Sequence, residues 1–275
     1  MKKLFICFFT LLLMAVFLCF AINAAENVVF LAAGGSGDGT SANSPVGSLD
    51  DAYEKIGGEG TVVICNDFPI SGKVAFPTHS GSVTLTSVYN GTDYRTAGDA
   101  AIRFSNTGTI NLHGPTVLDG LNIEIDSAAK SGVVIAANFN KLKFGNDFEF
   151  VYNYENTSLV TYLTGGPNND ATVPTLGEGE TIEIEIYSGE FLYFTPFSRS
   201  VKNAAHYGTA YVTIGGDAKV TGCYLGPITS GSTGGTTNCE IAGNATISTL
   251  YLAGNGGGMN GSVTVDVKNN ATISK

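Results

Sequence analysis

One short segment of the chain gathers cationic and aromatic side chains at close spacing. A guanidinium or ammonium group can hydrogen-bond a carboxylate, and an aromatic ring can stack on a sugar or on a cation. We therefore take residues 195–211 as the candidate ligand-binding segment, with an acidic sugar as its ligand. Its candidate contact residues are Phe197, Arg199, Lys202, His206 and Tyr207. The alternative is a solvated loop whose charges only keep it soluble.

A longer polar segment, residues 153–179, precedes this cluster. It carries Tyr154 and Tyr162 in a run that is rich in Gly, Pro and Asn. In proteins built from stacked repeats, such insertions emerge as loops on one face, where function is often located. The segment is therefore a second place at which a ligand could contact the protein.

The residues needed for familiar catalytic and metal sites are scattered. Histidine occurs only at His79, His113 and His206, and none has a metal-ligand companion at useful spacing. No G-x-S-x-G motif is present. Asp38, in the Gly-rich stretch, comes one residue early for a calcium-binding nonapeptide repeat. The sequence therefore predicts no catalytic residue and no cofactor, with calcium as the one alternative left open.

The first 25 residues have the order of a secretory signal peptide. Two lysines precede an apolar run that begins at Leu4, and small residues follow at Ala24 and Ala25. An uncleaved membrane anchor is the alternative, because the apolar run approaches the length that spans a bilayer. We expect residues 1–25 to be removed, which leaves a protein that is secreted or held at the cell surface, without a membrane segment of its own.

The mature chain, residues 26–275, is predicted to be one all-β domain. Its net charge is −12, against −10 for the full chain, because two lysines leave with the signal peptide. An acidic chain without a run of Lys or Arg is not a nucleic-acid binder. The full chain has 36 Gly and only 14% charged residues, which favours strands and turns. Only Cys65, Cys223 and Cys239 remain, so at most one disulfide can form.

One short helix is predicted ahead of a long series of strands. Ser48 followed by Asp51 resembles a capping box, and apolar residues then recur at helical spacing until Ile56. Two glycines end the helix. Many short apolar runs follow, among them 101–104 and 109–112, and each is expected to be a strand.

Three stretches in the first half of the chain follow one another in a recognisable order. They read GGSGDGTSANSPVGSLDDAYEKI, GEGTVVIC and TINLHGPTVLDGLNIEI. This order resembles the start of the secreted right-handed parallel β-helix proteins of the pectate-lyase-like superfamily. The resemblance implies an all-β, right-handed parallel β-helix, a solenoid whose short N-terminal helix caps the open end of the strand stack. The Gly-rich stretch would then be an end-piece rather than a ligand loop.

The second half of the chain contains an internal repeat. Four residues occupy equivalent places in it, namely Ile186, Ile214, Ile241 and Val267. Their spacings of 28, 27 and 26 residues are typical of solenoid coils, whose apolar residues stack in one internal column. Asn244 and Asn270 also share a repeat position, which predicts an asparagine stack at a corner of the coil.

The repeat stops in mid-coil. After Asn270 only five residues follow, whereas the preceding unit continued through TLYLAGNGGG. A β-helix that ends in this way exposes its last strands to pairing with other chains. We therefore expect either that the chain is a fragment of a longer polypeptide or that a partner covers the open end.

Two hypotheses of function come from these observations. The preferred one is a non-catalytic extracellular or cell-surface β-helix protein that acts in adhesion or glycan binding, with an extracellular polysaccharide as its partner. The alternative is a carbohydrate-active enzyme, either a lyase or a hydrolase. The superfamily's lyases use clustered Asp side chains that hold calcium and an Arg base, and this chain, which has only Arg95, Arg103 and Arg199, does not match that pattern. An enzyme would need converging acids or a cationic base in a groove, and a scaffold needs neither.

Overall fold

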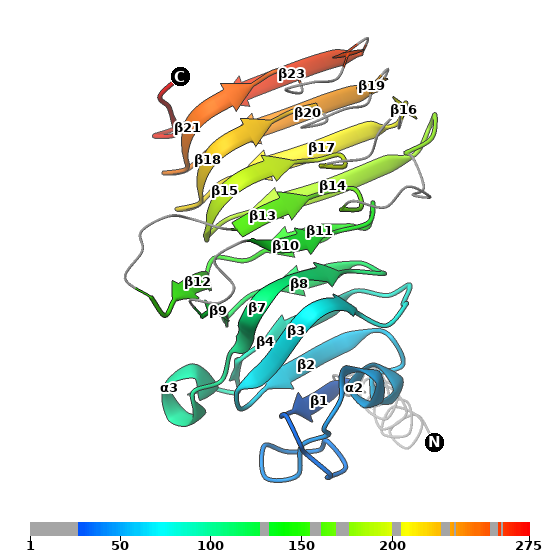
Figure 1. Cartoon of the computed structure of the whole chain (residues 1–275), viewed down its shortest axis with the longest axis vertical. Helices are drawn as coiled ribbons and strands as arrows, with labels where there is room; N and C mark the ends of the chain where they lie inside the picture. Colours follow the sequence, from blue (N-terminus) through cyan, green and yellow to red (C-terminus); the bar gives the residue numbers. More distant parts are fainter. Residues whose placement is uncertain are drawn as a thin grey trace, which may run out of the picture.

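A computed structural model describes most of the chain. The described residues are 27–126, 132–154, 161–168, 176–199, 205–226, 232–233, 235–253, 258–259 and 261–275. The structure is 50% strand and 6% helix, and its strands form a parallel β-solenoid (Figure 1). The predicted fold class, an all-β right-handed parallel β-helix with a short N-terminal capping helix, is confirmed. The predicted signal peptide, residues 1–25, lies outside the described residues.

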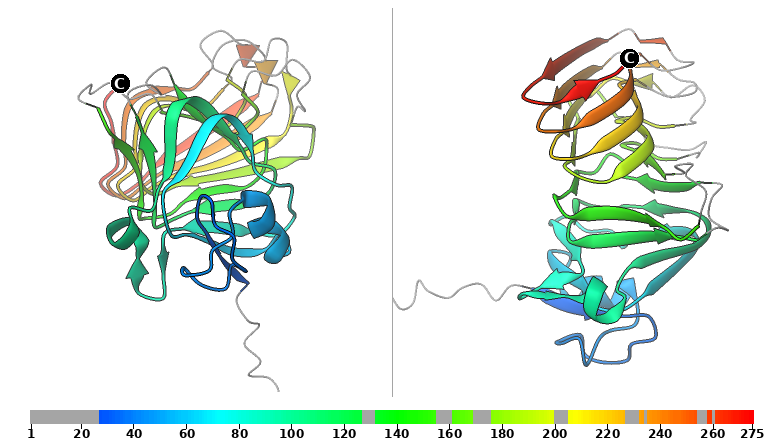
Figure 2. Two further views of the ribbon diagram at one scale, coloured as in Figure 1. Left: turned by 60° about the horizontal axis from the view of Figure 1, so that its bottom comes forward. Right: turned by 90° about the vertical axis from the view of Figure 1, so that its left-hand side faces the viewer.

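The first of two long sheets, sheet A, contains nine parallel strands stacked in chain order. Each coil adds one strand to this sheet (Figure 2). The strands are β1 (Val28–Leu31), β2 (Gly60–Ile64), β4 (Val83–Thr86), β8 (Thr116–Leu118), β11 (Leu142–Phe144), β14 (Thr181–Ile186), β17 (Thr209–Ile214), β20 (Thr236–Ile241) and β23 (Ser262–Val267).

The second long sheet, sheet B, contains ten strands, one of which, β3, joins the others only through β7. In order along the sheet the strands are β12 (Phe148–Tyr152), β9 (Leu121–Ile125), β7 (Ile102–Asn111), β10 (Val133–Ala136), β13 (Thr161–Thr164), β15 (Glu190–Thr195), β18 (Lys219–Tyr224), β21 (Thr246–Tyr251) and β24 (Thr272–Ile273), with β3 (Phe68–Ala75) beside β7.

Strand β7 differs from the expectation of two separate strands. It is one unbroken strand that covers both predicted segments, 101–104 and 109–112, except for the first residue of the one and the last residue of the other. Its first part pairs with β9 and its last part with β10, so one strand serves two neighbours. On its other edge, β7 pairs with β3 along both its first and its last part, with a shift of register after Ile70. This pairing with β3 keeps the two parts of β7 in one extended strand.

The remaining elements are small. Strands β16 (Ala205–His206), β19 (Ser232–Thr233) and β22 (Gly258–Met259) form a third parallel sheet, and β5 (Val88–Tyr89) and β6 (Thr92–Asp93) form an antiparallel hairpin that leads into helix α3 (Tyr94–Gly98). None of the helices in the described part of the chain has the length and hydropathy needed to cross a bilayer.

The core lies between the two long sheets. Along β14, the inward residues Ile182, Ile184 and Ile186 are buried, while the glutamates between them are more exposed, as the two-residue period of a strand requires. Aromatic rings fill the middle of the solenoid, where Phe144 contacts Phe148 and Phe191 edge-on, with centroids 4.8 and 5.1 Å apart. Each coil buries little alone, and the stack makes a continuous core.

Helix α2 (Leu49–Lys55) and the Gly-rich stretch before it form the N-terminal end-piece (Figure 1). The Asp51 N–H donates to the Ser48 hydroxyl at 3.1 Å, and that hydroxyl donates to the Asp51 carboxylate at 2.7 Å. The apolar face ending at Ile56 is buried, and two glycines with positive φ follow it. The capped helix and its limits are confirmed.

The internal repeat is in register throughout sheet A. Ile186 pairs with Ile214, Ile214 with Ile241, and Ile241 with Val267. At the following corner, the Asn270 amide donates to the Asn244 side chain at 3.5 Å, and the Asn244 amide donates to Asp217 at 3.0 Å. The predicted asparagine stack is confirmed, with an aspartate as its first member.

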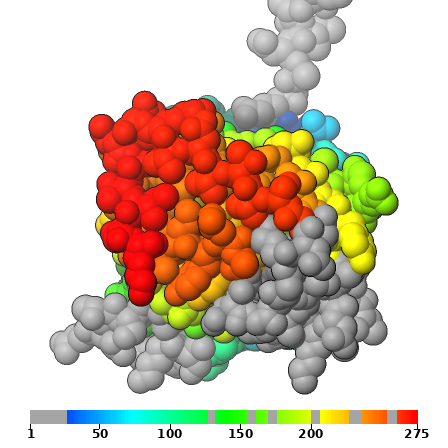
Figure 3. Space-filling view, turned by 90° about the horizontal axis from the view of Figure 1, so that it is seen from above, coloured from blue at the N-terminus to red at the C-terminus, as the bar shows by residue number. Residues whose placement is uncertain are grey.

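The C-terminal end of the stack is formed by the last rung (Figure 3). Strand β23 pairs with β20, and among the described residues no strand covers its other edge. Val263, Val265 and Ile273 are only partly buried, although they continue the columns of the core. The last rung therefore presents apolar side chains and unpaired backbone groups.

Candidate functional site

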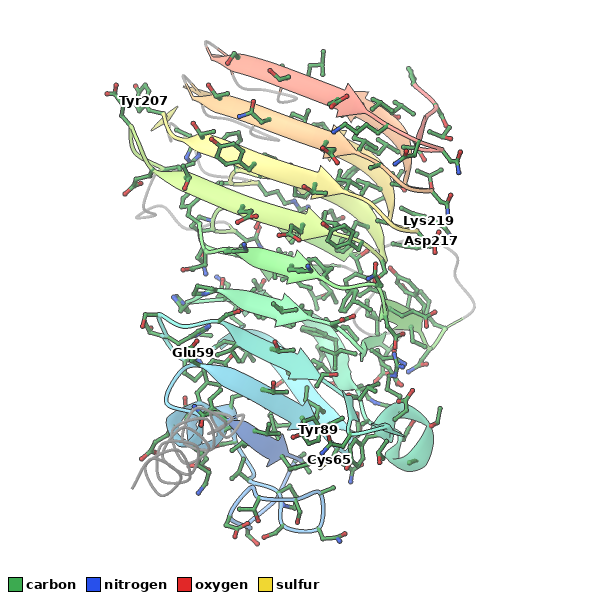
Figure 4. The ribbon with its side chains drawn as sticks, turned by 180° about the vertical axis from the view of Figure 1, so that it is seen from behind. Glu59, Cys65, Tyr89, Tyr207, Asp217 and Lys219 are labelled. Carbon is green, nitrogen blue, oxygen red and sulfur yellow. The ribbon has the colours of Figure 1, made fainter. Side chains whose placement is uncertain are left out.

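The structure does not bring the four described contact residues together on one surface. The Arg199 guanidinium lies over the ring of Tyr162, with its central carbon 3.8 Å from the ring centroid. Phe197 and His206 are 0% exposed. Tyr207 is 58% exposed and lies near the far end of the stack from the N-terminal strands (Figure 4). Lys202 lies outside the described residues.

Phe197 and His206 pack in the core rather than at the surface. Their rings stack, with centroids 5.2 Å apart and an interplanar angle of 24°. The backbone N–H of Leu176 donates to His206 Nδ1 at 3.3 Å, and burial lowers the pKa of His206 to about 4. A neutral, fully buried imidazole cannot touch a ligand unless the fold opens. We therefore revise the candidate site to one that keeps Arg199 and leaves out these two rings.

Four tyrosines line up beside Arg199 on the outer face of sheet B. We call them the tyrosine ladder: Tyr162, Tyr193, Tyr224 and Tyr251. Successive rings have centroid distances of 5.6, 5.7 and 4.3 Å, and the last pair is stacked at 3°. Tyr251 is 39% exposed. Tyr162 and Tyr193 are partly buried, and Tyr224 is only 5% exposed. The ladder is thus a run of touching rings across four strands, of which Tyr162, Tyr193 and Tyr251 are accessible for stacking against sugar rings.

Gly222 makes room for this ladder. It pairs with Tyr193 in the sheet, at a position where a side chain would point outward between two rings. A Cβ atom there would lie 2.6 Å from Cδ1 of Tyr193 and 3.1 Å from Cε2 of Tyr224. Only glycine lets the Tyr193 ring lie across the next strand and reach Tyr224.

A groove of about 370 Å³ adjoins the ladder at its Arg199 end. We call it the Arg199 groove. Besides three glycines, it is lined by Lys73, Thr107, Thr109, Val134, Asn168 and Arg199. Its floor and the first two tyrosines of the ladder belong to one column of paired residues. Lys73 pairs with Thr109, Thr109 with Val134, Val134 with Tyr162, and Tyr162 with Tyr193. The groove and the ladder therefore form one continuous surface along the stack.

The described residues that line the Arg199 groove carry a charge opposite to that of the chain. The full chain carries a net charge of −10, yet the groove is lined by two cations, Lys73 and Arg199, and by no described Asp or Glu. The amide oxygen of Asn168 is buried and has no hydrogen-bond partner in the described part of the chain. A ligand with carboxylate and hydroxyl groups would match these side chains.

The spacing of the ladder tyrosines is a signal in the sequence that a search for motifs misses. These tyrosines recur at 31, 31 and 27 residues, close to the coil period. Tyr162 and Arg199 belong to two separate predicted insertions, and the structure brings them into contact. No regular spacing marks two further polar residues of the groove. Lys73 lies in a strand far away in the sequence, and Asn168 lies in an irregular segment.

The described side chains give less support to a metal-dependent function. No group of three or more His, Cys, Asp or Glu residues in that part of the chain could hold a metal ion. Neither the protein-family models, nor the curated proteins, nor the solved structures with which the chain was compared match it. Function is therefore inferred from the site itself.

Proposed function

We propose that the protein is a non-catalytic, carbohydrate-binding β-helix that holds an acidic polysaccharide on the outer face of sheet B. The observation that carries the proposal is the contact of Arg199 with Tyr162, at the junction of the Arg199 groove and the tyrosine ladder. A sugar carboxylate would accept hydrogen bonds from Arg199 and Lys73, and neighbouring sugar rings would lie along the tyrosines.

The proposal includes a location outside the cell or at its surface. The order of charged, apolar and small residues in 1–25 supports secretion. Kinship with the pectate-lyase-like superfamily is part of the same proposal, and it is supported by the resemblance of the first half of the chain and by the parallel solenoid. In this role the repeated face serves adhesion or binding to an extracellular matrix.

Calorimetric titration of residues 26–275 with oligogalacturonate and with its methyl ester tests the proposal. We expect the acid to bind and the ester to bind more weakly, because esterification removes the charge. Arg199→Gln should weaken binding of the acid by about tenfold or more, the usual effect of losing a hydrogen bond to a charged group. Equal binding of acid and ester would contradict the assignment of an acidic ligand.

Lys219→Gln is the matched control. Lys219 is an exposed cation on β18 of the same sheet, where it pairs with Glu190, and it does not line the groove (Figure 4). This change removes the same unit of charge and should leave the affinity nearly unchanged. Incubation of the protein with the polymer should release no reducing or unsaturated ends. Their release would favour the alternative, a carbohydrate-active enzyme.

A further inference from the structure

A second groove lies on a different face of the molecule, over the first strands of sheet A. It consists of two adjoining hollows of about 520 and about 390 Å³ that share Tyr89, and we call it the Tyr89 groove. Tyr89 is in the β5–β6 hairpin, at the end of the stack that carries the N-terminal strands (Figure 4). Nothing in the site on sheet B accounts for it.

Aromatic rings form one part of the Tyr89 groove. Phe30 points outward from β1, where Tyr89 and Tyr94 meet it edge-on, with centroids 5.8 and 6.1 Å away. Phe30 is buried by these contacts, whereas the two tyrosines remain partly exposed. The rings are held in place by packing, so little conformational entropy is lost when a ligand stacks on them.

Hydroxyl and carboxylate groups form the other part. Thr61 and Thr84 pair directly in adjacent strands of sheet A, so their side chains lie one above the other on the outer face. Asp119 and Asp147 line the same hollow at the following corner. One oxygen of Asp119 accepts the N–H groups of Gly120 and Asp147, at 3.1 and 3.0 Å.

A salt bridge fixes the acidic corner. Both oxygens of Asp147 accept hydrogen bonds from Arg95 on helix α3, at 2.9 and 2.7 Å. Arg95 also binds Asp93, which caps the same helix. The hairpin, the helix and the corner of the coil are thereby joined, and the shape of the Tyr89 groove is set before any ligand arrives.

The chemistry of this groove differs from that of the Arg199 groove. No described Lys or Arg lines it. Arg95 pairs with both Asp93 and Asp147, so together with Asp119 this corner keeps a net negative charge, which would repel an anionic polymer. Sugar hydroxyls can donate to carboxylates and exchange hydrogen bonds with threonines, and the apolar face of a sugar can lie on a tyrosine ring. We propose that the Tyr89 groove binds a neutral polysaccharide. Together with the acidic ligand of the proposed function, on which this last step rests, the protein would then hold two polysaccharides of different charge.

Titration of residues 26–275 with four neutral oligosaccharides tests this site without reference to the first. The probes are cellohexaose, xylohexaose, mannohexaose and laminarihexaose. We expect at least one to bind, and Tyr89→Ala to weaken that binding about tenfold through loss of ring stacking. Thr84→Val, which keeps a β-branched side chain on the strand and replaces the hydroxyl with a methyl group, should weaken it by a smaller factor.

Tyr211→Ala and Arg199→Gln are the controls. Tyr211 is 49% exposed on the same sheet but far along it, in β17, and neither residue lines the Tyr89 groove. Both variants should bind the neutral probe as the wild type does. If circular dichroism shows that Tyr89→Ala is misfolded, two other measurements decide. They are the affinity of Thr84→Val for the probe, and the degree to which the bound probe protects Tyr89 of the wild type from oxidation by hydroxyl radicals. Absence of binding by all four probes, or binding that only Arg199→Gln weakens, would overturn the proposal.

Discussion

His206 lies in the core between Phe197 and Phe139, with ring-centroid distances of 5.2 and 5.3 Å. Burial lowers its pKa to about 4, below the ordinary value of 6.5. Between these two values the unfolded chain binds a proton that the folded protein does not. The free energy of unfolding should therefore fall as the pH drops from 6.5 towards 4, by up to about 3 kcal/mol from this residue.

Urea unfolding of the wild type and of His206→Phe, at several pH values between 7 and 4.5, measures this contribution. The carboxylates titrate alike in both proteins, so the difference between the two curves isolates the histidine. We expect His206→Phe to be the less stable at pH 7, because Leu176 loses its hydrogen-bond acceptor, and to lose less stability on acidification. Parallel curves would show that His206 takes up its proton in the folded state as readily as in the unfolded one.

Single residues were the hardest part to predict from the sequence. Arg199, Phe197 and His206 are near neighbours in one polar segment, and residue type alone suggested a common site. In the structure residues 194–198 are all buried, and Arg199 lies partly exposed directly after them, against Tyr162. No two-residue period marks this stretch, whereas such a period is plain in strands such as β14.

Helix α2 is the element whose limits depend most directly on one side chain. The Ser48 hydroxyl accepts the N–H of Asp51, which would otherwise lack a partner in the first turn. Ser48→Ala should lower the free energy of unfolding by about 1 kcal/mol, as measured by urea denaturation. Ser80→Ala is the control, because Ser80 is exposed and makes no side-chain hydrogen bond to a described residue, and it should change little. Equal effects of both changes would contradict the capping role.

Elements were predicted well where the signal is local. The cap at Ser48 and the two glycines after Ile56 defined α2, and the repeat of Ile186 and its equivalents defined the rungs of sheet A. The error in β7 has a non-local cause, because its continuity depends on the long edge that β3 provides. The hairpin that positions Tyr89 has a similar origin, since its packing on Phe30 joins segments that are distant in the sequence.

On the scale of the whole molecule, the period of the sequence predicted the architecture because each coil contacts only its neighbours. The same one-dimensional order gives each face its own chemistry. Sheet B carries Lys73, Tyr162 and Tyr193 in one column of paired residues, and the first strands of sheet A carry threonines beside an acidic corner. The register of the coils decides which residues share a face. Insertions of unequal length between the strands hide that register in the sequence.

The outer edge of β23 should govern self-association of residues 26–275. Among the described residues its backbone groups have no strand beyond them, and Val265 continues the inward column above Cys239. Such an edge pairs with other chains unless a charge blocks it. Sedimentation velocity should show the wild type associating as its concentration rises and Val265→Lys remaining smaller, because an inward-pointing ammonium group at the open end cannot be buried by an added strand. Thr213→Lys, on the outer face in the middle of sheet A, should associate like the wild type. If both lysine variants reduce association equally, added charge rather than the edge is responsible.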